Sequence, residues 1–189
     1  MSSIIPLLLA PFLLCLWGCN SCPFPDTSEA AFSVEGSVTG SESPECATAV
    51  ALWLGDVGEG DYTYKYGEGA ADGDAFAVTF DDPPPDEAIL AGWAGIAFVA
   101  VLPEGESLAD GIVEEEEFGE AGFTMRHAVI WKPGDPSITG TWLDGFPAGW
   151  SCGGCVGSQG FDEFEPVDCG EVEIQTGDAI EETEFCEWT

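Results

Sequence analysis

Residues 76–85 read Phe-Ala-Val-Thr-Phe-Asp-Asp-Pro-Pro-Pro, and this stretch decides the fold class. Phe76, Val78 and Phe80 alternate with smaller or polar residues, so they share one face of an extended strand. The prolines at 83–85 end the strand, because proline lacks the backbone N–H that a β-ladder needs. The pattern predicts a strand that is buried on one face and stops at Asp81.

The same signature recurs along the chain after residue 31. Apolar runs predict strands at 47–54, 93–102, 139–146 and 167–176, and alternation predicts others at Phe32, Val34 and Val38, at Tyr62, Tyr64 and Tyr66, and at Phe123, Met125, His127, Val129 and Trp131. Most runs are bounded by Gly, Pro or Asp, and the sequence has no stripe of helical period. We therefore expect one all-β domain over residues 32–189, an antiparallel sandwich or partly open barrel of about eight to nine strands.

Four short motifs follow one another in the first part of this domain. They are Gly36-Ser37-Val38, Val50-Ala51-Leu52, Gly73-Asp74 and Phe76-Ala77-Val78-Thr79-Phe80. In this order they resemble the small β-sandwiches of the transthyretin and carboxypeptidase-regulatory type. The resemblance covers residues 32–80 and implies a sandwich for that part of the chain.

The chain begins with a leader. Ile4 to Trp17 is apolar and no charged side chain precedes Asp26. At the helical rise this stretch spans about 21 Å, which is shorter than a membrane-spanning helix. Residues 1–18 therefore match a signal peptide, and the protein is expected to be exported.

The leader ends in Leu16-Trp17-Gly18-Cys19, which resembles the lipobox of bacterial lipoproteins. The resemblance implies cleavage before Cys19 and a diacylglycerol group on its sulfur. Asn20, where Asp tends to retain lipoproteins in the inner membrane, implies delivery to the outer membrane. Residues 19–31 would then be a lipidated tether. An ordinary secretory signal is the alternative.

The cysteines agree with export. Eight are present, and removal of Cys15 with the leader and lipidation of Cys19 leave Cys22, Cys46, Cys152, Cys155, Cys169 and Cys186. Six thiols in an oxidising compartment can form up to three disulfides, for which fifteen pairings exist. Because four of the six lie after residue 150, we expect a C-terminal part stapled by disulfides. The alternatives are thiol–disulfide exchange through Cys152 and Cys155, or zinc held by these two with Cys169 and Cys186.

The charge excludes one class of partner. Three basic and 36 acidic residues give a formal net charge of −33. Three cations cannot make a phosphate-binding patch, so no nucleic acid partner is expected. The acidic loops predict either adaptation to concentrated salt, where repulsion is screened, or calcium binding, for which the sequence offers the candidates Asp56, Glu59, Asp61, Asp72 and Asp74.

Signals for catalysis are weak. His127 is the one histidine and lies within an alternating apolar series, where a buried strand residue is expected rather than a base. The sequence has no nucleophile elbow and no phosphate-binding glycine loop. We therefore expect no enzyme and no cofactor apart from the calcium alternative. The expected function is a structural or interaction module of the cell envelope, with the membrane and an envelope protein as partners; a calcium-dependent binding module and a thiol–disulfide oxidoreductase are the alternatives.

Overall fold

The computed structural model describes residues 22–55, 63–89, 94–102, 106–113, 122–124, 126–134, 142–155 and 164–177. These residues form eleven strands and three short 3₁₀ helices. The strands are β1 (Phe32–Gly40), β2 (Ala47–Leu54), β3 (Thr63–Asp72), β4 (Ala75–Phe80), β5 (Gly95–Val101), β6 (Gly111–Val113), β7 (Gly122–Phe123), β8 (His127–Lys132), β9 (Gly149–Cys155), β10 (Phe164–Val167) and β11 (Glu173–Thr176). The 3₁₀ helices are η1 (Asp86–Ala88), η3 (Trp142–Gly145) and η5 (Cys169–Glu171). No helix in this described part of the chain has the length and apolarity needed to cross a membrane.

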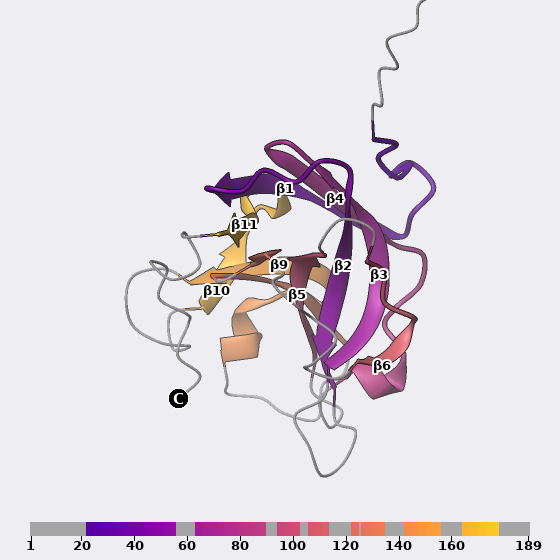
Figure 1. Ribbon diagram of the computed structural model, residues 1–189. Helices are drawn as coiled ribbons and strands as arrows, with labels where there is room; N and C mark the ends of the chain where they lie inside the picture. The colour runs from indigo at the N-terminus through magenta and orange to yellow at the C-terminus, as the bar shows by residue number, and fades with distance from the viewer. Residues whose placement is uncertain are drawn as a thin grey trace, which may run out of the picture.

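Seven strands close into a barrel. The order is β5-β2-β3-β4-β1-β11-β7, and β7 returns to β5 through the pair Ala100 and Phe123. Within this ring β1 and β11 run parallel and the other neighbouring pairs are antiparallel. The curved strands are visible around a common axis in Figure 1. The all-β expectation is confirmed, in the form of a barrel, and closure leaves the ring without unpaired edge strands.

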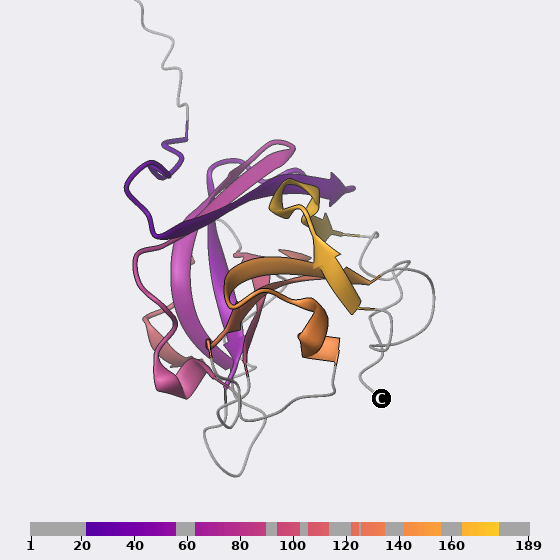
Figure 2. The ribbon, with the colours of Figure 1, turned by 180° about the vertical axis from the view of Figure 1, so that it is seen from behind.

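Three further strands extend the sheet from β5. The first part of β5, Gly95–Ala97, pairs with β8, whereas its last two residues pair with β7. Strands β9 and β10 then continue from β8 in antiparallel order. Figure 2 shows this orange extension with η3 beside it. The same edge of β5 therefore pairs first with β8 of the extension and then with β7 of the barrel.

Alternation places the apolar faces of these strands inside the barrel. Val34 and Val38 of β1 and Phe76, Val78 and Phe80 of β4 are buried in one cluster, as the sequence predicted. Trp150 from β9 joins the cluster, and its ring stacks on Phe32 at 5.0 Å between centroids. The members of this aromatic cluster are Phe32, Trp53, Tyr66, Phe80, Trp131 and Trp150. The interior cluster therefore combines these aromatic rings with the aliphatic side chains of the barrel strands.

Two smaller cores cover the outside of the sheet. One lies between η3 and the outer face of the extension, and it contains Ile96, Ile130, Leu143, Phe146 and Phe164. The other lies over β2 and β5 and contains Val50, Leu52, Ala100 and Leu102. Strands β2 and β5 are thus buried on both faces, which explains why their sequences are continuous apolar runs rather than alternating ones.

The strand expected at 139–146 is wrong within the described residues. The backbone instead forms η3, with Phe146 N donating to the Leu143 carbonyl at 3.1 Å. Leu143 and Phe146 are three apart, so they share one side of a 3₁₀ turn, whereas in a strand they would point to opposite faces. Both pack against the outer face of the extension.

The strand expected at 167–176 is interrupted. It contains the end of β10, then η5, then β11. The Asp168 side chain accepts a hydrogen bond from Gly170 N at 2.9 Å, which begins the turn, and Cys169 is bonded to Cys152. The expected alternation from Phe123 to Trp131 is likewise divided between β7 and β8. Local capping and a covalent cross-link thus override the strand propensity.

The segment Cys152-Gly153-Gly154-Cys155 is the end of strand β9. A Cβ at Gly153 would lie 2.3 Å from the Phe164 ring, and one at Gly154 would lie 3.0 Å from the His127 ring. The two glycines therefore let side chains from the neighbouring strands β10 and β8 cross close over the backbone.

Candidate functional site

The structure assigns disulfide partners to four of the six candidate cysteines. Cys22 is bonded to Cys46, and Cys152 to Cys169. Cys155 is also disulfide-bonded, whereas Cys186 and the lipidation candidate Cys19 lie outside the described residues. The expected C-terminal disulfide stapling is confirmed. The N-terminal bond joins the segment before β1 to the β1–β2 loop.

The arrangement of Cys152 and Cys155 does not favour thiol exchange. The two residues lie three apart on a strand, so their side chains point to opposite faces. Cys152 is 1% exposed within the interior cluster, and its sulfur is bonded to Cys169. Cys155 packs on the other side, against the outer core beneath η3. A disulfide-exchange pair needs two neighbouring sulfurs and one accessible thiolate, and this geometry supplies neither.

His127 lies at the start of β8, where it packs against β9. Its Nδ1 is buried and has no hydrogen-bond partner among the described residues. Burial lowers the pKa of the imidazole below its ordinary value, and Arg126 lowers it further, although Glu173 and Glu171 act in the opposite direction. A neutral ring in such a strand position fits the structural role that the sequence predicted.

Two of the five acidic candidates, Asp72 and Asp74, lie within the described residues. Asp56, Glu59 and Asp61 lie outside the described residues. Asp72 accepts a hydrogen bond from Cys46 N at 3.1 Å, and Asp74 is exposed at the same β3–β4 turn. Within the described ranges, no three His, Cys, Asp or Glu residues are grouped so that they could hold a metal ion. Asp72 therefore has a structural role at the turn.

The three cationic side chains of the protein donate hydrogen bonds to groups within the fold. Lys65 is 3% exposed and its Nζ donates to Glu68 at 2.5 Å and to the Leu108 carbonyl at 3.0 Å. Lys132 Nζ donates to the Leu143 and Phe146 carbonyls, at 2.6 and 2.8 Å, and so fixes η3 to β8. Arg126 donates to the Cys155 carbonyl at 3.4 Å. Because each cation is used inside the fold, the acidic surface is left without basic patches in the described residues.

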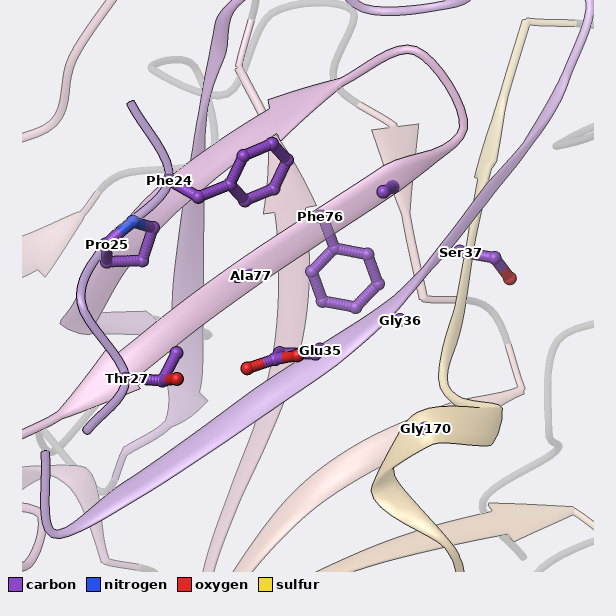
Figure 3. A pocket seen from close by; sticks show the side chains of 10 residues that line it. Phe24, Pro25, Thr27, Glu35, Gly36, Ser37, Phe76, Ala77 and Gly170 are labelled. Carbon is purple, nitrogen blue, oxygen red and sulfur yellow. The ribbon is translucent and has the colours of Figure 1, made fainter. Parts of the chain in front are cut away.

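A groove lies on the outside of the barrel. It has a volume of about 490 Å³, within the usual range of ligand sites, and lies between the segment before β1 and the outer faces of β1 and β4. Figure 3 shows its lining: Phe24, Pro25, Thr27, Glu35, Gly36, Ser37, Ala75, Phe76, Ala77 and Gly170.

The groove exists because small side chains face outward there. Ala75 and Ala77 of β4 stand opposite Ser37 and Glu35 of β1 in the strand register. Phe24, which is 41% exposed, forms the opposite wall. An apolar floor with a single carboxylate can accept an apolar group that carries a hydrogen-bond donor or a positive charge. Sequence reasoning missed this groove; the signal was a pair of alanines on the polar face of an otherwise well-alternating strand.

Fold and groove together define a small, disulfide-bonded β-barrel with an acidic surface. In comparisons with known proteins, the chain matches no family model, no curated protein and no solved structure.

Proposed function

We propose that this protein is an exported, lipid-anchored module of the cell envelope, attached to the outer membrane through Cys19, whose barrel has a structural or interaction role rather than a catalytic one. The observation that carries the proposal is the agreement between leader and cysteines. The leader predicts an oxidising compartment, and every candidate cysteine in the described residues is disulfide-bonded. Such bonds persist outside the cytosol and are rare within it.

The groove beside Phe24 is the place where we expect an envelope protein partner to bind. Glu35 lies on its β1 side, and the molecule as a whole carries a net charge of −33. A partner of opposite charge is favoured by this field. A lysine or arginine side chain fits the lining, because its aliphatic stem can lie on Phe24 and Ala77 while its charged end meets Glu35.

The anchoring proposal is tested by Cys19→Ser in the full-length protein expressed in a Gram-negative host. Wild type should enter the detergent-rich phase in phase separation, and Cys19→Ser should stay in the aqueous phase, because loss of the acyl chains removes the anchor. Ser21→Ala is the matched control and should behave as wild type. Equal partition of Cys19→Ser and wild type would refute lipidation at this residue. A further variant, Asn20→Asp, should move the anchored protein to the inner membrane.

The groove is tested by titration with phenethylammonium, an apolar group with one positive charge, followed by NMR of the soluble domain. Saturable shifts should appear at Ser37, Ala75 and Ala77 and should be lost in Glu35→Gln. The matched control Glu29→Gln removes one charge away from the groove lining and should bind as wild type. Equal weakening in both variants would mean that the cation responds to total charge, which would overturn a specific role for Glu35.

A further inference from the structure

The Cys22–Cys46 disulfide attaches the N-terminal segment to one end of the barrel. Cys46 lies in the β1–β2 loop, and its N–H donates to Asp72 at 3.1 Å. The same loop is held to the β3–β4 turn by Gly73 N, which donates to the Pro44 carbonyl at 2.8 Å. Figures 1 and 2 both show the indigo N-terminal segment running along the barrel before β1 begins. The point of covalent attachment is therefore part of a rigid end of the molecule.

The position of this bond changes the length of the tether. Between Cys19 and Cys22 there are three residue steps, which reach at most about 11 Å when fully extended. Without the bond, a free linker would run from Cys19 to the start of β1 at Phe32, and its root-mean-square span would be about 20 Å with a much longer maximum. The disulfide thus replaces a flexible tether by a short one.

We propose that the Cys22–Cys46 disulfide orients the barrel on the membrane, with the β1–β2 loop and the β3–β4 turn facing the lipid surface. The inference rests on the proposed lipidation of Cys19. Because the tether is short, the loop containing Cys46 lies close to the bilayer. The opposite end of β4, where Phe80 leads into Asp82, lies about 20 Å further along the barrel at the usual rise of a strand.

Charge and tether act against each other at the attached end of the barrel. The side chains of Glu42, Glu45 and Asp74 are exposed around the attachment point. The net charge of −33 is distributed over a domain whose few cations are occupied internally. Anionic lipids repel the whole domain, its attached end included, so the short tether holds that end near the bilayer against the repulsion while the rest of the barrel points away. Salt weakens this repulsion, because the Debye length falls to about 3 Å in 1 M salt.

The orientation is tested on the full-length lipidated protein in vesicles of phosphatidylethanolamine and phosphatidylglycerol. A ketone-bearing amino acid is incorporated at Glu45 or at Asp82 and labelled with a fluorophore, so that no cysteine is added. Spin-labelled lipid headgroups serve as the quencher. At low salt the probe at Glu45 should be quenched strongly and the probe at Asp82 weakly.

Two variants test the role of the disulfide. In Cys22→Ser/Cys46→Ser the ratio of quenching at the two positions should fall towards unity, because the tether lengthens. An insertion of Gly-Ser repeats between Ser21 and Cys22 keeps the disulfide and should reduce quenching at Glu45, even if the double variant folds poorly. Equal quenching at the two positions in membrane-bound wild type, or a ratio that neither variant changes, would overturn the orientation while leaving lipidation intact. Wild type that fails to bind vesicles would overturn the anchoring proposal, and the orientation with it.

Discussion

Trp150 is the residue whose truncation tests the packing argument most directly. It comes from β9, which makes no ladder with β1, β2 or β4, yet its ring meets side chains of all three. The centroid distances are 5.0 Å to Phe32, 5.7 Å to Trp53 and 4.7 Å to Phe80. Trp150 therefore links the extension to the barrel interior by side-chain packing, in addition to the backbone ladder between β8 and β5.

The size of the effect follows from this geometry. An aromatic side chain buries about 150–250 Å², worth about 4–6 kcal/mol at the usual coefficient, and that is an upper bound. Trp150 is partly exposed. We therefore expect Trp150→Ala to lower the free energy of unfolding by about 3 kcal/mol, the lower end of the range for such truncations. Trp150→Phe keeps a ring in place and should lose about 1 kcal/mol.

The assay is urea unfolding followed by far-UV circular dichroism, which avoids the loss of a fluorescent reporter. Phe24→Ala is the matched control, because its ring is 41% exposed and lies outside the barrel. It should cost about 0.5 kcal/mol or less. If Trp150→Ala cost no more than Phe24→Ala, the aromatic cluster would not hold the extension to the barrel, and the packing argument would fail.

Three other predictions concern charge. Lys65→Met should lower the free energy of unfolding by about 1–2 kcal/mol at low salt and by less in molar salt, because its partners Glu68 and Asp110 are exposed and their attraction is screened. Hydrogen exchange at Ile112 should show whether β6, which pairs with β3 beside Lys65, loosens. An effect that does not depend on salt would contradict the ion-pair account. The pKa of His127 is lowered in the folded protein, so near its ordinary pKa the unfolded chain takes up a proton that the folded chain does not. The contribution of His127 to the free energy of unfolding should therefore fall as the pH drops from about 7.5 to about 5.5, and His127→Phe should remove this contribution in urea unfolding. An unchanged dependence of the unfolding free energy on pH in His127→Phe would contradict the argument. With a net charge of −33, the melting temperature should rise from low to molar sodium chloride, and calcium should add no more than magnesium at equal ionic strength; a larger calcium effect that persists in high salt would support specific calcium sites instead.

Much of the fold could be read from local pattern. The alternation of Phe76, Val78 and Phe80 predicted β4 and its inward face, because successive side chains of a strand point to opposite sides. The apolar run at 47–54 predicted β2 with the bounds that the structure has. These features depend on the chain's own periodicity and on the stop signals beside it, so the sequence by itself determined an all-β domain.

The rest was decided by contacts between residues far apart in the chain. Leu143 and Phe146 lie on one side of a 3₁₀ turn because both pack into the outer core on the extension. A glycine is needed at position 153 of β9 because a Cβ there would lie 2.3 Å from the Phe164 ring. For the candidate site, the sequence identified the cysteines but not their pairs, since pairing requires the fold to bring Cys22 to Cys46 and Cys152 to Cys169. It likewise could not show the groove or the closing pair of β5 and β7, because spatial proximity across many residues leaves no periodic trace in the chain.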